Sequence, residues 1–296
     1  MTDSEHPHSL PYFGEALKTA DIARNPASGV LFHYTSAEGL CGIVSTGSIW
    51  ATHASFVNDT SEQSYGQSLL PVALDRLSAA GFEDVQRLLT PMLQSGIGHD
   101  VYAACFCEYD DLLPQWRGYG ADGSGYAIGF PSASLSRDGA AALLPVAYGD
   151  EAVLLRFKRL VDWAIFKLRQ FQIEDSLNQT SATDIITSLA SSLYLLIVAS
   201  KKAVFEYEKE WRLVHLMDRD PPIEYDKIGI RPIGGMLAPY LSLELPRMTD
   251  NALSISSVRC GPSLRDVSVR AGVEMLLAKH ALSHVPVLSS DAPIRR

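Results

Sequence analysis

The sequence has no apolar run long enough to cross a lipid bilayer. Its longest candidate, residues 189–199, includes Ser and Tyr and falls well short of the roughly 20 apolar residues that a transmembrane helix requires. The opening MTDSEHPHSLPYF has neither a basic start nor an apolar stretch, so no signal peptide is expected. These absences predict a cytoplasmic protein without a membrane partner.

Cysteine and positive charge are scarce as well. The chain has no C-x-x-C pair, which argues against a zinc ribbon, and no metal site is expected. We interpret all four cysteines as reduced thiols in or near the core: Cys41, Cys105, Cys107 and Cys260. The 25 Lys and Arg against 34 Asp and Glu give a net charge of −9, which argues against broad, non-specific binding of nucleic acid but leaves it open as a substrate.

The sequence contains neither a P-loop spacing nor a dinucleotide fingerprint after a strand, so kinase-like and Rossmann-type sites are not expected. It also has no internal repeat and no long linker, and one domain is the simplest organisation. Residues 1–28 are expected to be peripheral. Residues 29–296 are expected to form a single α+β domain with a helical insertion at about 151–200, because short strands and irregular loops do not fit a regular βαβ repeat.

Hydrophobic periodicity and turn residues predict the individual elements. Ser36 is expected to cap a helix that runs to Thr46 and ends at Gly47. Further helices are predicted within 61–93, at 153–171, at 185–196 and in a segment ending near His280. Strands are predicted at 30–34, 48–52, 101–107, 125–130, 141–148, 211–216, 256–260 and 285–288.

Two early segments carry candidate site residues. His33 lies in the middle of an apolar strand, where an imidazole is costly to bury unless both ring nitrogens find partners. A core histidine bonded to backbone and a site histidine both fit this position. The segment Phe56–Glu62 contains Asn58 and Asp59, which favour a turn and a helix cap, and its spacing matches no established metal motif.

A third segment, from Cys105 to Tyr126, places Trp116 and Arg117 among several glycines. Stacking surface, a cation and a mobile backbone suit an aromatic ligand that carries a phosphate. A Gly-rich surface hairpin whose Trp packs on the core explains the same residues.

The fourth segment is acidic. On a strand from Glu206 to Val214, the side chains of Glu206, Glu208 and Glu210 all face one way. Like charges this close need a compensating cation or ligand, and the nearby basic residues that would supply it are Lys201, Lys202 and Arg212. A solvated strand face is the alternative. We therefore place any chemistry at His33 and the Glu208/Glu210 pair.

In this order the four segments resemble a bacterial family known only as a domain of unknown function. Its members look like HYT near the start, followed by FxNDxxE, CFxE…WxxYgxxxxGyaiGF and a late ExEWR. The corresponding segments here are His33-Tyr34-Thr35, Phe56–Glu62, Cys105–Phe130 and Glu208–Arg212, so the resemblance spans about residues 30–290.

A more remote resemblance is to ADP-ribosyltransferases, in particular to the toxins of this class that act on DNA. The strand with His33 and Thr35, the helix beginning near Ala37 and the stop at Gly47 look like the opening of these enzymes. The strand with Glu210, followed by Trp-Arg-Leu-Val, is similar to the one that bears their catalytic glutamate. The resemblance implies a mixed, mostly antiparallel sheet and NAD as the substrate. The chain departs from the pattern in lacking a clear middle tyrosine or STS motif.

The resemblance also implies roles for individual residues. Glu210 would stabilise the cationic transition state as nicotinamide leaves, and Glu208 would orient the acceptor nucleophile. His33 would hydrogen-bond the adenine-side ribose, and Thr35 would hold the nicotinamide-side backbone. The further residues implied in NAD binding, aromatic for stacking and basic for the pyrophosphate among them, are Tyr34, Trp50, Asn58, Asp59, Trp116, Arg117 and Arg212.

The leading hypothesis is an NAD-dependent ADP-ribosyltransferase that modifies a macromolecular acceptor, either nucleic acid or protein. Such an enzyme would act as a toxin or phage-defence effector, with an immunity or sensor protein as a further partner. The alternative enzymes are an NAD glycohydrolase and a metal-dependent hydrolase using Asp59, Glu62 and Glu210. A non-enzymatic nucleotide-sensing or interaction module, with the loop from Trp116 to Tyr126 as its binding surface, stays open too.

Overall fold

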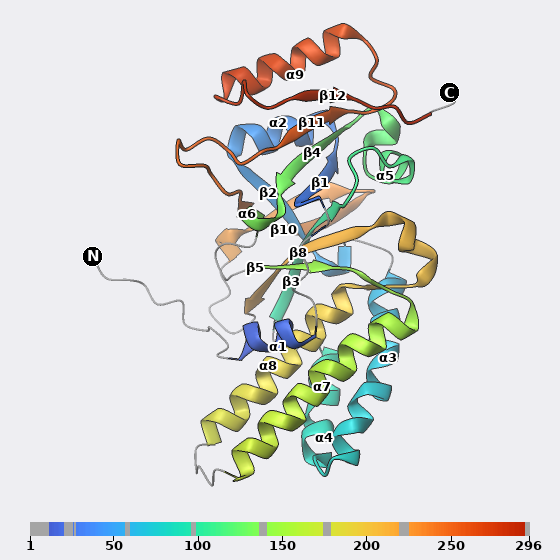
Figure 1. Cartoon of the computed structure of the whole chain (residues 1–296), viewed down its shortest axis with the longest axis vertical. Helices are drawn as coiled ribbons and strands as arrows, with labels where there is room; N and C mark the ends of the chain where they lie inside the picture. Colours follow the sequence, from blue (N-terminus) through green and yellow to red (C-terminus); the bar gives the residue numbers. More distant parts are fainter. Residues whose placement is uncertain are drawn as a thin grey trace, which may run out of the picture.

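Figure 1 shows the computed structural model, which describes residues 12–20, 26, 28–56, 60–95, 99–135, 141–173, 179–218 and 225–293. A sheet flanked by short helices forms one end of the molecule, and a bundle of long helices forms the other. The expected α+β class is confirmed. In the described ranges no helix has the length and apolar character needed to span a membrane.

The sheet is mixed and mostly antiparallel, as expected. Its order is β12-β11-β4-β1-β3-β2-β10-β9, with β8 paired to β3 and β5 paired to β8. Strands β11 and β12 run parallel to each other. The strands of this sheet are β1 (Val30–Thr35), β2 (Ser48–His53), β3 (His99–Cys107), β4 (Tyr126–Pro131), β5 (Ala141–Pro145), β8 (Glu210–Asp218), β9 (Ile228–Ile233), β10 (Met236–Glu244), β11 (Ser257–Cys260) and β12 (Val287–Ser289).

The sheet divides at β3. Along one edge β3 pairs with β8 over its whole length. Along the other edge it meets β1 through the pair Phe32↔Cys107 and β2 through the pair Thr52↔Ala103. Strand β1 therefore joins the C-terminal end of β3 and β2 joins its middle, with residues 104–106 between the two pairings. This division places the side chains of β1 beside the middle of β3.

The unit β1–α2–β2 follows its sequence signals. The Ser36 hydroxyl accepts a hydrogen bond from the Gly39 amide at 3.2 Å and caps α2 (Ala37–Thr46). Gly47 ends the helix in the left-handed conformation, with φ 70°, as the sequence predicts. Helix α2 packs on one face of the sheet in a cluster shared with α9 (Val267–Lys279) and with residues of β3 and β8: Tyr102, Ala104, Phe106, Trp211 and Leu213.

The helical insertion is present as α7 (Gly149–Ile173) and α8 (Gln179–Val198). These helices pack with α3 (Thr60–Ala79), α4 (Glu83–Ser95) and α1 (Phe13–Thr19), and α1 lies within the segment expected to be peripheral. The bundle core reaches the second face of the sheet at Ala103 and Val214, which alternate along their strands with the residues of the first face. Figure 1 shows the bundle meeting the sheet at only one end.

Two parts of the sheet differ from the sequence expectation. The segment predicted as one strand at 141–148 divides into β5 and a short β6 (Ala147–Tyr148), which pairs in parallel with β7 (Ser200–Lys201) in a separate small sheet. The hairpin of β9 and β10 was not predicted. It turns through Gly234 and Gly235, which both have positive φ, because a two-residue hairpin turn favours residues without a Cβ.

The cysteine expectation holds in part. All four thiols are free. Cys107 and Cys260 are buried and Cys105 is partly buried, but Cys41 is exposed because it lies on the outer face of α2.

Two glycines provide a matched test of the packing around β1. A Cβ on Gly125 would lie 2.3 Å from the backbone oxygen of Thr35, whereas a Cβ on Gly42, in α2, would meet nothing within 4 Å. We expect Gly125→Ala to lower the free energy of unfolding by about 1–3 kcal/mol, because the clash is with backbone. Gly42→Ala should raise it by about 0.5–1 kcal/mol through its helix propensity. Urea unfolding measures both, and equal shifts in the two variants would contradict the close approach.

Candidate functional site

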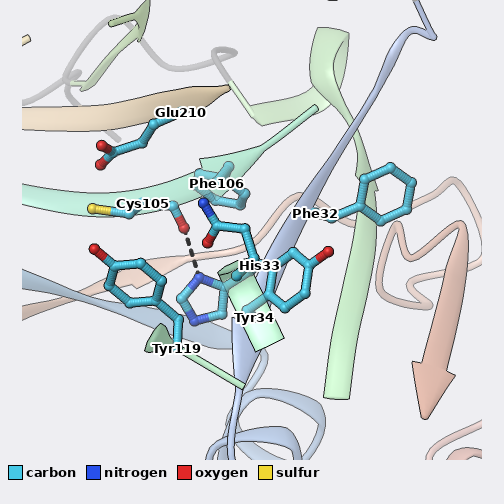
Figure 2. Close-up of a pocket in the computed structure, with 8 residues that line it drawn as sticks. Phe32, His33, Tyr34, Cys105, Phe106, Tyr119 and Glu210 are labelled. Atoms are coloured by element: carbon cyan, nitrogen blue, oxygen red, sulfur yellow. Dashed lines mark hydrogen bonds between the residues drawn. The ribbon is translucent and has the colours of Figure 1, made fainter. Parts of the chain in front are cut away.

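A pocket opens at the division of the sheet, between β1, β3 and β8 (Figure 2). The cavity volume is about 50 Å³. This is well below the roughly 300–1,000 Å³ of most small-molecule sites, so a larger ligand has to extend out of the pocket mouth. The lining residues are Phe32, His33, Tyr34, Cys105, Phe106, Gln115, Tyr119 and Glu210. The structure thus brings together His33 and Glu210, which are far apart in the sequence.

His33 lies on β1, and its side chain reaches the backbone of β3. Its Nδ1 lies 2.8 Å from the carbonyl oxygen of Cys105, and its ring is 5.7 Å from that of Phe106. Because a carbonyl only accepts, Nδ1 carries the proton and Nε2 keeps its lone pair. Burial lowers the pKa of His33, and the positive charge of Arg231 lowers it further against the opposing effect of the Cys105 carbonyl. His33 is therefore a neutral imidazole at pH 7 with one acceptor nitrogen to offer.

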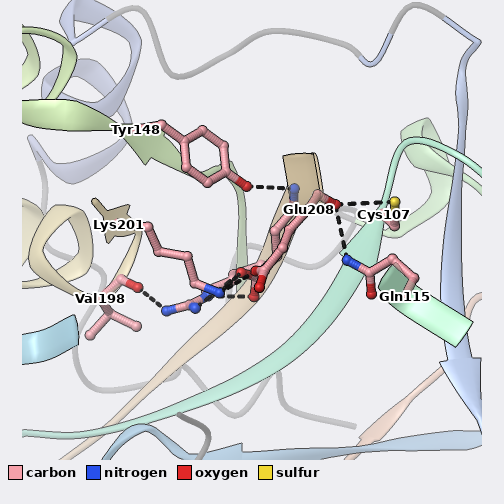
Figure 3. Close-up of polar contacts among 8 residues, drawn as sticks. Cys107, Gln115, Tyr148, Val198, Lys201 and Glu208 are labelled. Carbon is pink, nitrogen blue, oxygen red and sulfur yellow. Dashed lines mark hydrogen bonds and ion pairs between the residues drawn. The ribbon is translucent and has the colours of Figure 1, made fainter. Parts of the chain in front are cut away.

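Glu210 begins β8 and belongs to a buried ionic cluster. Its Oε1 accepts from Arg212 Nε at 2.7 Å, and its Oε2 accepts from Arg212 Nη2 at 3.1 Å and pairs with Lys201 Nζ at 2.7 Å. Lys201 also donates to Glu208 at 2.5 Å and is 0% exposed. Two carboxylates and two cations balance one another, which is the compensation expected from Lys201 and Arg212 (Figure 3). Lys202, the third residue considered for this role, is exposed.

The ionic cluster joins the site to the helical bundle. Arg212 also donates through Nη1 to the carbonyl oxygen of Val198, the last residue of α8, and Figure 3 shows this contact beside the Lys201 side chain. Lys201 follows α8 directly, on β7. Tyr148, on β6, accepts a hydrogen bond from the Glu210 amide at 2.8 Å. The position of the Glu210 carboxylate therefore depends on the end of α8 and on the small sheet of β6 and β7.

Glu210 is ionised at neutral pH. Its burial alone would raise the pKa of the carboxyl, but the charges and hydrogen bonds of Arg212 and Lys201 outweigh burial and lower the pKa to about 2. Burial, followed by the Glu210 charge, raises the pKa of the nearby Cys105 thiol. The Glu210 carboxylate lines the pocket as an acceptor that the hydroxyl of a ligand can reach.

The low pKa of Glu210 gives a pH prediction. Since its folded pKa lies below the ordinary value of 4.5, ionisation of Glu210 contributes stability that is complete above about pH 5 and is lost as the pH falls toward 2. We expect the melting temperature of the wild type to fall steeply over this interval. Glu210→Gln should show a shallower fall, since it has no proton to take up at this position. Parallel curves for the two proteins from pH 6 to pH 3 would contradict the assignment.

The acidic segment is not a continuous strand, which corrects the sequence prediction. Residues Ala203–Glu208 form a 3-10 helix, Lys209 has a positive φ of 47°, and β8 begins at Glu210. Glu206 therefore points to solvent, while Glu208 and Glu210 are buried and converge on Lys201. The sharp bend at Lys209 allows the carboxylates of Glu208 and Glu210 to share the Lys201 ammonium group. On a regular strand the two carboxylates would lie farther apart.

Tyr119 and Gln115 complete the pocket. Both belong to the glycine-rich segment singled out in the sequence, but neither is among the residues implied there in NAD binding. Gln115, in α5 (Leu113–Gly118), donates from Nε2 to the backbone oxygen of Glu208 at 3.0 Å. Tyr119 is 44% exposed, and its ring lies beside His33 with the hydroxyl directed toward Cys105 and Glu210 (Figure 2). Burial of the hydroxyl and the nearby Glu208 charge raise the pKa of Tyr119, so it stays a phenol. Its signal in the sequence is the Trp-Arg-Gly-Tyr-Gly run, in which Trp116 is the larger aromatic residue.

The other residues predicted to bind NAD have different surroundings. Trp116 is fully buried, donates to Asp111 at 2.7 Å and packs edge-on against Tyr34, so it supports the pocket wall from behind. Arg212 is engaged by Glu210 and Val198 rather than turned toward a pyrophosphate. The pocket lining does not include Thr35, Trp50, Arg117 or Glu208. Asn58 and Asp59 lie outside the described residues, as does the side chain of Glu62.

A family model described as "Protein of unknown function (DUF2971)" matches residues 115–213, about a third of the chain. The matched segment begins at Gln115 and includes Tyr119, Tyr148, Lys201, Glu208 and the start of β8. It does not include His33. No curated protein and no solved structure matches the chain. The resemblance to a domain of unknown function is thus supported over this segment, and the comparisons give no support for ADP-ribosyltransferases.

Proposed function

We propose that this chain cleaves the bond between nicotinamide and ribose in NAD and transfers ADP-ribose to a macromolecular acceptor. The observation that carries the proposal is the pocket in which His33 and Glu210 meet beside Tyr119. An ionised carboxylate, a neutral imidazole acceptor and an aromatic ring can each serve this reaction. The resemblance of the two strands that bear His33 and Glu210 to those of ADP-ribosyltransferases adds to this argument.

The chemistry assigns a role to each group. As the glycosidic C–N bond breaks, nicotinamide leaves with the bonding electron pair and the ribose carbon becomes cationic. The Glu210 carboxylate accepts from a ribose hydroxyl and stabilises this developing charge. His33 Nε2 accepts from a second hydroxyl of the dinucleotide, and the Tyr119 ring packs on an aromatic group. The acceptor then adds to the ribose carbon and loses a proton.

The arrangement of cations fits a positioning role. Lys201 and Arg212 hold the Glu210 carboxylate from the side away from the pocket lining, so the group does not have to reorganise as charge develops. Glu208 shares Lys201 but does not line the pocket. In this proposal Glu208 positions Glu210 through Lys201. It does not orient the acceptor nucleophile, which is the role that the resemblance implied.

The test is release of nicotinamide from NAD by the purified protein, with adenylate-labelled NAD to follow the ADP-ribose. The proposal expects release that increases when protein or nucleic acid from a cell lysate is added, with the label attached to that acceptor. Release that yields only free ADP-ribose would identify a glycohydrolase and contradict the transferase. Activity that ignores NAD and vanishes with a chelator would favour a metal-dependent hydrolase. A folded protein that releases no nicotinamide with any acceptor would reject NAD cleavage.

A further inference from the structure

An exposed aromatic pair lies outside the pocket, on strands β2 and β10. Trp50 is 44% exposed although its ring stacks on Tyr240, with the centroids 4.3 Å apart and the planes inclined by 27°. The guanidinium carbon of Arg231, on β9, lies 5.6 Å from the Trp50 ring centroid. We call Trp50, Tyr240 and Arg231 the Trp50 platform. None of the three lines the pocket.

The register of the strands places the platform on the pocket side of the sheet. Directly paired residues of antiparallel strands share a face. Thr52 pairs with Ala103, and Tyr240 pairs with Thr52, so Tyr240 lies on the same face as Ala103 and Cys105. Trp50 is two residues from Thr52 and shares that face. Strand β2 pairs with β3 at Ala103, two residues before Cys105.

Arg231 is poorly compensated for a partly buried cation. Its Nη2 donates to the Thr52 hydroxyl at 2.6 Å. Within the described part of the chain, its buried Nε–H has no acceptor and no carboxylate lies within ion-pair distance. Burial lowers the pKa of Arg231, and its charge reaches far enough to lower the pKa of His33. In a chain of net charge −9, this cation is left to attract an anion from outside.

Trp50 keeps 44% of its surface exposed although its ring stacks on Tyr240. The Trp50 ring is held by stacking on Tyr240, and the Arg231 guanidinium beside it has no carboxylate partner among the described residues. This arrangement suits a ligand with a flat ring and an adjacent anion. A nucleotide has both, because its base stacks on aromatic rings and its phosphate pairs with arginine.

We propose that the Trp50 platform binds a nucleotide, with the base on Trp50 and the phosphate on Arg231. The source of the nucleotide is either a free adenylate, including that of a dinucleotide, or one unit of a single-stranded nucleic acid. The binding surface does not depend on the cleavage reaction proposed above, since it shares no residue with the pocket. It adds a second contact beside the pocket for a ligand that extends along the sheet.

Equilibrium binding of AMP and of a four-nucleotide single-stranded DNA tests the proposal without any turnover. Loss of base stacking costs about 1–3 kcal/mol, so Trp50→Ala should raise the dissociation constant of at least one probe about tenfold or more. Trp50→Phe, which keeps a ring, should retain most of the binding. Arg231→Gln should weaken AMP more than adenosine, because the phosphate is its target. The matched control is Lys227→Gln, which removes an exposed charge at the start of the same hairpin.

The outcomes separate the sources and the two proposals. Platform-dependent binding of AMP identifies a free nucleotide, and platform-dependent binding of the DNA alone identifies a polymer. Glu210→Gln should bind the probes like the wild type, so nucleotide binding without nicotinamide release would reject the reaction and keep the platform. No binding of either probe, binding unchanged by Trp50→Ala and Arg231→Gln, or an equal loss with Lys227→Gln would overturn the platform.

Discussion

Replacing Lys201 by Met is expected to lower the free energy of unfolding by about 3–5 kcal/mol, the usual cost of removing one partner from a buried ion pair. Lys201 is fully buried and holds the carboxylates of Glu208 and Glu210 at 2.5 and 2.7 Å. Without its ammonium group, the two buried negative charges face each other, while Arg212 still pairs with Glu210. Denaturant unfolding followed by circular dichroism measures the loss.

Lys202→Met is the matched control for Lys201→Met, since its side chain is the same and lies one residue away but is exposed. Its effect should stay within about 0.5 kcal/mol, as for most surface substitutions. A second variant, Lys201→Met with Glu208→Gln, should lose less than the sum of the single losses, because one uncompensated charge is removed. Equal small losses for Lys201→Met and Lys202→Met would contradict the buried ionic cluster.

Glu210→Gln is expected to reduce nicotinamide release by about 10²–10³-fold, the range found when one preorganised electrostatic contact to a transition state is removed. The substitution keeps the shape of the side chain and removes its charge. Glu206→Gln is the control, because Glu206 carries the same charge four residues earlier but faces solvent. It should leave the release unchanged within about twofold.

The interpretation of Glu210→Gln requires that the protein remain folded, since the same carboxylate holds Arg212 and Lys201. Activity is therefore measured where circular dichroism and the unfolding midpoint show a folded variant. Tyr119→Phe tests the pocket without disturbing the ionic cluster. Tyr119 lines the pocket from the exposed side and lies outside the contacts of that cluster. Full activity in folded Glu210→Gln would remove Glu210 from the reaction.

Local signals made the first part of the fold predictable. The Ser36 cap and the left-handed Gly47 are both specified within one helix length, so the sequence of strand, helix and strand could be derived without tertiary information. The apolar stripe of α7 is equally local. The compensation of the acidic residues by Lys201 and Arg212 was also predictable, because buried carboxylates require cations and few were near in the chain.

The bend at Lys209 was not predictable from the alternation of residues. The pattern of Glu206, Glu208 and Glu210 has the period of a strand, but Lys209 adopts a left-handed conformation that lysine rarely takes. The hairpin of β9 and β10 was missed for a related reason. Pro232 and Pro239 interrupt its two strands, and proline normally argues against a strand.

The membership of the pocket was the least accessible to sequence reasoning. Tyr119 reaches the pocket from the loop after α5, and Cys105 reaches it from β3 because the sheet divides there. Such convergence depends on strand order and register, which single-sequence patterns do not contain. The exposed Trp50 was a candidate for stacking, but its partners Tyr240 and Arg231 lie on the unpredicted hairpin.

The central position of β3 has a consequence for how the chain assembles during synthesis. Its long partner β8 begins about 100 residues later, which corresponds to roughly 5–20 s of translation at 5–20 residues per second. During this interval β1 and β2 can pair with one edge of β3. The opposite edge of β3 stays unpaired until β8 has been synthesised. The helices between β3 and β8 emerge first, and Lys201 precedes Glu210 by only a few residues. The pocket is therefore among the later features to form on the ribosome.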